Sequence, residues 1–218
     1  AGHCRKAEWS VVPAELRDAE RTASKSQQAD DGEFSRKIDS QDEDIGSRAV
    51  IRNARELVWD PSEVDTSIRT GWFYHPEENT DVRTADELLD IYLDAVGANA
   101  SLLLNIPPDT HGRIAAPDCA SLAELGTKIQ QIFASNVTEK AAITADSAIA
   151  QHPITQAVDG MADTYWQAAY GQEFDTITLK FPKPQKVSCV VLGEHLPTGQ
   201  RIESGEIWAD GSKVSEFT

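Results

Sequence analysis

A continuous apolar run at residues 101–106 (SLLLNI), closed by two prolines, constrains this sequence more than any other feature. A run of this length that shows no polar face is typical of a strand buried on both sides, as in a parallel sheet. Parallel strands require long crossover connections, which are usually helices. We therefore expect helices on both sides of this strand.

Both neighbouring segments meet that expectation. Thr84 and Glu87 form a capping box, apolar residues follow at helical spacing, and Gly97 supplies a C-terminal stop. A second apolar stripe predicts a helix over 117–133. The order of helix, buried strand, loop and helix indicates an α/β fold. Upstream, residues 63–76 alternate and then end in an aromatic cluster, which predicts a short strand running into a loop.

The last third of the chain has a different pattern. Three apolar or alternating segments, at 177–181, 187–192 and 202–208, are separated by Pro and Gly turns. Short strands spaced in this way predict a β-sandwich or jelly roll, here a partial one, because about 80 residues is short for that fold. We expect two domains, 1–136 and 137–218.

Charge excludes some classes of partner. The 218 residues include 36 acidic and 20 basic side chains, for a net charge of −16. This excess would repel nucleic acid, and it disfavours anionic lipid surfaces. No apolar run approaches the roughly 18–20 residues of a membrane span.

The chain begins at Ala1, and its only methionine is Met161, so we expect a processed chain or a fragment whose signal peptide would lie in a missing N-terminal part. The three cysteines, Cys4, Cys119 and Cys189, are odd in number and show no CxxC spacing. They therefore predict neither a disulfide framework nor a zinc site.

Three strings, at 8–13 (EWSVVP), 63–76 (EVDTSIRTGWFYHP) and 102–114 (LLLNIPPDTHGRI), together resemble the α-L-fucosidases of glycoside hydrolase family 29. The resemblance is strongest to the subgroup that acts on α-1,3/1,4-linked fucose, and it covers about residues 1–135. It implies that this region is the C-terminal portion of a (β/α)8-type barrel.

The resemblance also implies retaining hydrolysis, which uses two carboxyl groups about 5–5.5 Å apart. The nucleophilic Asp and the acid/base Glu of the family match no residue here, and both are expected upstream of Ala1. The fragment itself is therefore predicted to be inactive. Glu8, Glu15, Glu63 and Asp109 are carboxylates inside the chain, but with so many acidic residues they carry little catalytic signal.

The resemblance implies four substrate-binding candidates: Trp72, Arg69, His75 and Trp9. The indole of Trp72 would pack against the C5-methyl side of fucose, and barrel-top core is the alternative. Arg69 would bind a sugar hydroxyl or a site carboxylate, or else form a structural salt bridge. His75 would donate to the sugar or be structural, and Trp9 would line the aglycone side or the core. Asn105 is expected to cap the Pro-Pro turn.

Strings at 157–166, 174–179 and 200–202 resemble a discoidin (factor 5/8 type C, family 32 carbohydrate-binding) module over about 138–218. This resemblance implies a structural calcium held by Asp159, Asp163 and Thr164, whose oxygen atoms suit that ion. The alternative is an Asx-type turn before a buried Trp166. No cofactor is expected for catalysis.

Three functions are compatible with this sequence. The chain is part of an exo-α-L-fucosidase, a non-catalytic glycan-binding unit, or a structural fragment without activity of its own. The first two predict fucosylated oligosaccharides or glycoconjugates as partners. They also predict an extracellular or periplasmic location.

Overall fold

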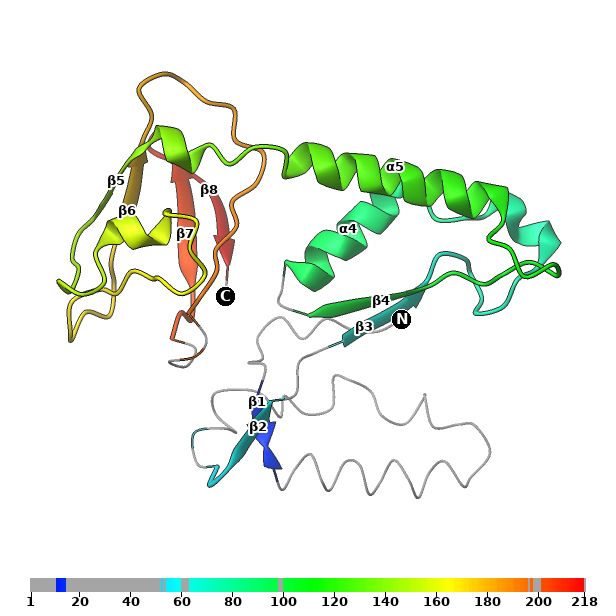
Figure 1. Cartoon of the computed structure of the whole chain (residues 1–218), viewed down its shortest axis with the longest axis horizontal. Coiled ribbons are helices and arrows are strands. Elements are labelled where there is room, and N and C mark those ends of the chain that lie inside the picture. Colours follow the sequence, from blue (N-terminus) through cyan, green and yellow to red (C-terminus); the bar gives the residue numbers. More distant parts are fainter. Residues whose placement is uncertain are drawn as a thin grey trace. The chain divides into compact units, whose positions relative to one another are not determined.

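The computed structural model describes residues 11–14, 52, 54–59, 63–97, 100–195, 197 and 201–217. These residues form strands, α-helices and short 3-10 helices (Figure 1). In chain order they are β1 (Val11–Pro13), β2 (Leu57–Trp59), β3 (Glu63–Ser67), η1 (Pro76–Thr80), α4 (Ala85–Val96), β4 (Ser101–Asn105), α5 (Ala116–Ile132), η2 (Thr138–Lys140), β5 (Ala142–Ala145), η3 (Ile154–Ala157), β6 (Ile177–Lys180), β7 (Gly205–Ala209) and β8 (Ser212–Phe217).

The chain divides into two compact units. The first contains residues 1–128 together with 201–218, and the second contains 129–200. The domain boundary expected between residues 136 and 137 stays a prediction. In the part of the chain that the structure describes, no helix has the length and apolar character needed to cross a membrane.

A β–α–β arrangement forms the centre of the first unit. Strands β3 and β4 pair in parallel, with Glu63 opposite Ser101 and Ser67 opposite Asn105. Helix α4 connects the two strands and lies over them (Figure 1). Their shared core includes Val64, Ala95 and Leu102. The parallel pairing predicted from the apolar run is confirmed.

The two predicted helices are confirmed, one of them with its boundaries shifted by one residue. Thr84 is the N-cap of α4: its Oγ1 accepts a hydrogen bond from the Glu87 amide, and Glu87 accepts one from the Thr84 amide. The bond from the Thr84 amide, and a second one that the Thr84 hydroxyl donates to the same carboxylate, lower the pKa of the Glu87 carboxyl, because they favour its charged form. Gly97 is the C-cap, as the pattern predicted. Helix α5 begins and ends one residue before the predicted range of 117–133.

Two strand predictions need correction. Strand β4 is not buried on both faces, because Leu103 is 52% exposed. The cause is that β3 is the one strand paired with β4 among the described residues. Residues 187–192 are not a strand: they are irregular, and their side chains are exposed. No described strand pairs with them, and backbone groups without a sheet partner remain in contact with water.

The remaining pairs are antiparallel. Strand β1 pairs with β2, and β5 pairs with β6, which confirms the strand predicted at 177–181. Strand β7 overlaps the predicted strand at 202–208 and forms a hairpin with β8. Asp210 and Gly211 turn this hairpin, and both have positive φ, as a type I′ turn requires. The described sheets are thus small and two-stranded, within a mixed α/β architecture.

Candidate functional site

Two loops leave β3 and β4 at the same edge of the sheet. Because the strands are parallel and in register, their carboxyl ends at Ser67 and Asn105 lie opposite each other. The loop after β3 carries the aromatic cluster, and the loop after β4 carries the Pro-Pro turn. In α/β folds the carboxyl edge of parallel strands is where binding sites form. Both loops are therefore placed to build such a site.

Arg69 is a charged side chain of the loop after β3 that is almost completely buried, at 1% exposure. Its Nε and one Nη donate to the two carboxylate oxygens of Asp118 on α5, at 3.0 and 2.9 Å. The guanidinium also donates to Asn79 Oδ1 and to the His75 carbonyl, and it lies 4.8 Å from the ring centre of Tyr74. This geometry is that of the structural salt bridge, which was the alternative to a sugar contact.

Asn105 joins the ends of both strands. Its Nδ2 donates to Ser67 Oγ at 3.1 Å and to the Trp72 carbonyl at 3.0 Å. Ser67 Oγ in turn donates to the Gly71 carbonyl at 2.8 Å. Asn105 was expected to cap the Pro-Pro turn that follows it. The hydrogen bonds of its Nδ2 go instead to β3 and to the aromatic loop.

Trp72 and His75 are exposed. Trp72 is 49% exposed, so its indole has a free surface while its backbone is held. His75 is also exposed, and its carbonyl accepts from Arg69. A half-exposed indole with a fixed backbone can pack against the apolar side of a sugar ring. Substrate contact by Trp72, Arg69 and His75 stays a prediction.

The loop after β4 contains a tight turn around Asp109. Asp109 Oδ1 accepts hydrogen bonds from the amides of His111 and Arg113, at 2.8 and 2.9 Å. The bond from the Arg113 amide is the main cause that lowers the pKa of the Asp109 carboxyl, because it stabilises the charged form. Gly112 has a φ of +73° in this turn. Asp109 thus orders the loop.

Sequence reasoning did not find Asp118, although it pairs with Arg69. Asp118 lies in the first turn of α5 and is fully buried. An acidic residue in the first turn of a helix is common for electrostatic reasons alone, so it gave no signal of a distant partner. Trp9, Glu8 and Glu15 lie outside the described residues.

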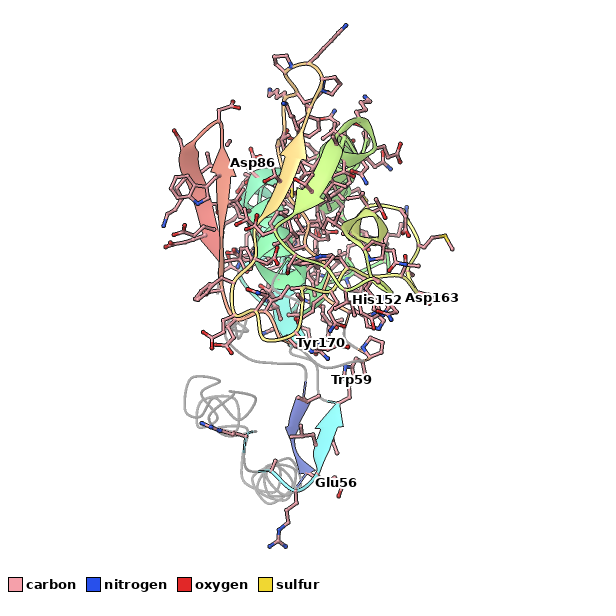
Figure 2. The ribbon with its side chains drawn as sticks, turned by 90° about the vertical axis from the view of Figure 1, so that its left-hand side faces the viewer. Glu56, Trp59, Asp86, His152, Asp163 and Tyr170 are labelled. Atoms are coloured by element: carbon pink, nitrogen blue, oxygen red, sulfur yellow. The ribbon has the colours of Figure 1, made fainter. Side chains whose placement is uncertain are left out.

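The predicted calcium ligands belong to the second unit. Thr164 Oγ1 lies 2.9 and 2.8 Å from the two carboxylate oxygens of Asp159, and Asp159 Oδ1 also accepts from the Met161 amide. Gly160 has a φ of +76°. These bonds are those of the Asx-type turn. Asp163 is exposed in the same run of loops between β5 and β6 (Figure 2).

The donor set fits calcium only in part. Two of the three predicted ligands adjoin each other, whereas calcium takes about six to eight oxygen ligands. Among the described residues, no three His, Cys, Asp or Glu side chains gather where they could hold a metal ion. Calcium binding stays a prediction. The Trp166 indole, half-buried rather than fully buried, donates to the Ser147 carbonyl at 3.0 Å.

Comparison with known proteins identifies the class as glycoside hydrolases. A sequence model of the family described as Alpha-L-fucosidase matches residues 17–131, which is more than half of the chain. This chain belongs to the α-L-fucosidase family. Alpha-L-fucosidase 1 of Arabidopsis thaliana is 34% identical over 151 residues, which are 67% of this chain and 29% of that protein.

Solved structures of fucosidases are also similar to this chain. A GH29 fucosidase of Ruminococcus gnavus in complex with fucose is 26% identical and has a TM-score of 0.67. The match covers 80% of this chain and 35% of that one. The D221A mutant of the same fucosidase, also in complex with fucose, matches equally well. The chain spans about a third of the length of the relatives that it matches.

Proposed function

We propose that this chain is part of a retaining exo-α-L-fucosidase that removes terminal α-1,3/1,4-linked fucose from oligosaccharides and glycoconjugates. Membership of the α-L-fucosidase family supports the activity. The observation that carries the proposal is Trp72, whose indole is half-exposed in the loop that follows β3. That loop leaves the carboxyl edge of the parallel strands, where barrel enzymes bind substrate.

The chemistry divides between binding and bond cleavage. Fucose has an apolar C5-methyl side that can pack on an indole, so Trp72 would bind and orient the sugar. A nucleophilic carboxylate and a protonated carboxyl must then act on the glycosidic bond from two sides. We propose that these two groups belong to a part of the barrel outside residues 1–218. Residues 1–136 would form the C-terminal portion of that barrel.

The activity is tested with the full-length protein that contains this chain. It is incubated with a branched glycan that carries α-1,3/1,4-linked fucose, and the anomer of the released sugar is followed by proton NMR. We expect α-fucose first, because two displacements at the anomeric carbon retain its configuration. Early release of β-fucose would contradict retention, and release of another sugar alone would refute the proposed function.

Linkage preference is tested separately, with α-1,2-linked fucose on an otherwise matched glycan. We expect slower release from that glycan than from the α-1,3/1,4-linked one. Equal rates would remove the subgroup assignment but leave the α-L-fucosidase activity intact.

For residues 137–218 we propose a partial discoidin-like, glycan-binding β-sandwich that holds a structural calcium in a secreted or periplasmic protein. The adjacency of Asp159 and Thr164 supports a shared site, and the antiparallel β5–β6 pair is compatible with a sandwich. Thermal unfolding of the full-length protein with calcium and with a chelator tests the ion. An Asp159→Asn variant that responds to calcium as the wild type does would refute these ligands.

A further inference from the structure

We propose that Asn105 is a positioning residue for substrate binding, because its side-chain amide holds the Trp72 loop in place. The proposal rests on the function proposed above, in which Trp72 binds fucose. Trp72 is half-exposed and Phe73 is 77% exposed, so packing does little to fix this part of the loop. We therefore infer that hydrogen bonds to the loop backbone fix the position of this part of the loop.

These hydrogen bonds converge on one amide and one hydroxyl. The two hydrogens of Asn105 Nδ2 have one acceptor each, the Trp72 carbonyl at 3.0 Å and Ser67 Oγ at 3.1 Å. The Ser67 hydroxyl in turn donates a hydrogen bond to the Gly71 carbonyl at 2.8 Å. The carbonyls of the two residues at the tip of the loop are thus tied directly or through Ser67 to Asn105.

The position of Asn105 suits this task. It is the last residue of β4, and its own carbonyl accepts the Ile68 amide at 3.0 Å, so its backbone is held in the sheet. A donor on a rigid strand can fix a loop more closely than a donor on another loop can. The side chain contacts the backbone of Trp72 and leaves the indole free to meet a ligand.

Asn105→Asp in the full-length protein tests the proposal with little change of shape. A carboxylate cannot donate, and it would place negative charge beside two oxygen atoms that now accept. We expect kcat/KM for an aryl α-L-fucoside to fall about 10- to 100-fold, the size of effect that a misplaced binding group produces. Asn136→Asp is the matched control and should leave kcat/KM unchanged. Asn136 Oδ1 accepts hydrogen bonds from the amide and hydroxyl of Thr138, and a carboxylate oxygen can accept the same bonds.

A double-mutant cycle with Trp72→Ala separates positioning from a general structural role. If Asn105 acts through Trp72, Asn105→Asp should cost little further activity once the indole is removed. Equal fold losses in both backgrounds would overturn the proposal. If Asn105→Asp does not fold, Asn105→Ser, which is neutral and too short to reach the Trp72 carbonyl, takes its place in the cycle.

A spectroscopic measurement tests whether Asn105 positions Trp72, and it does not require enzymatic activity. The protein is labelled with 5-fluorotryptophan, and the Trp72 signal is assigned by its loss in Trp72→Phe. We expect this signal to shift or broaden in Asn105→Asp, and an unchanged signal would overturn the proposal. If the wild type releases no fucose, the proposed function fails, while the fluorine spectrum still decides whether Asn105 positions Trp72.

Discussion

Arg69 and Asp118 form a fully buried, bidentate ion pair that connects the loop after β3 to the first turn of α5. The guanidinium also binds the carbonyl of His75, at the far end of the aromatic loop. The sequence left two roles open for Arg69, a bond to a sugar hydroxyl or a site carboxylate and a structural salt bridge. Its hydrogen bonds hold the loop to helix α5. They involve Arg69 and His75, whereas Asn105 contacts Trp72, which lies between them in the chain.

Arg69→Met should lower the free energy of unfolding by about 3–5 kcal/mol, because it leaves the Asp118 carboxylate buried without a partner. Lys128→Met is the control, since Lys128 pairs with the exposed Asp86 at the start of α4 (Figure 2). It should change stability far less. The double variant Arg69→Met/Asp118→Leu should recover much of the loss. Chemical denaturation measures all three, and a single Arg69→Met variant as stable as wild type would contradict the inferred role.

Trp72→Ala in the full-length protein should weaken fucose binding more than it destabilises the fold. A core tryptophan truncation costs about 3–5 kcal/mol, and the half-exposed Trp72 should cost clearly less. Calorimetric titration with fucose and thermal unfolding give the two quantities. Trp59→Ala removes an exposed indole from β2, outside the proposed glycan-binding module, and should leave the affinity for fucose unchanged. A collapse of stability with unchanged affinity would favour the core interpretation.

Two glycines should respond oppositely to the same substitution. Gly112 has a φ of +73°, so Gly112→Ala should destabilise the protein by about 1–2 kcal/mol. Gly126 lies within α5, with no atom within 4 Å of an added Cβ, so Gly126→Ala should stabilise it by up to about 1 kcal/mol. Denaturation midpoints measure both effects, and equal signs would contradict the turn geometry.

The Asp109 turn should weaken in acid. Because the pKa of the Asp109 carboxyl is lowered from its ordinary value of 3.8, the folded state favours the carboxylate. The stabilisation is therefore complete well above that value and is lost as the pH falls through the lower folded-state pKa. The difference in melting temperature between wild type and Asp109→Asn should shrink between neutral pH and about pH 3. A difference that does not change with pH would show that the charge is not involved.

Residues 1–218 alone should not turn over an aryl α-L-fucoside. Removal of catalytic groups that act together costs about 10⁶-fold in other hydrolases, and we propose that the catalytic pair of the family lies outside this chain. The parallel β3–β4 pair with its exposed Leu103 is also far from a closed barrel of eight strands. Turnover by protein from a host without fucosidase would place the pair within this chain.

The sequence by itself determined the elements whose signals are local. The capping box at Thr84 and Glu87, the stop at Gly97 and the apolar run before the prolines each lie within a few residues, and the structure confirms them. The motif strings also identified the family, because they record a shared ancestry that does not depend on packing.

Only the tertiary structure decided which side chains meet. Arg69 and Asp118 are 49 residues apart, and Asn105 and Trp72 are 33 apart, so no local pattern links them. The strand prediction at 187–192 was wrong for the same reason, since an apolar segment becomes a strand only where another strand offers hydrogen bonds. The parallel pairing of β3 with β4 depends on the whole fold. It places Asn105, at the end of β4, within hydrogen-bond distance of the Trp72 carbonyl.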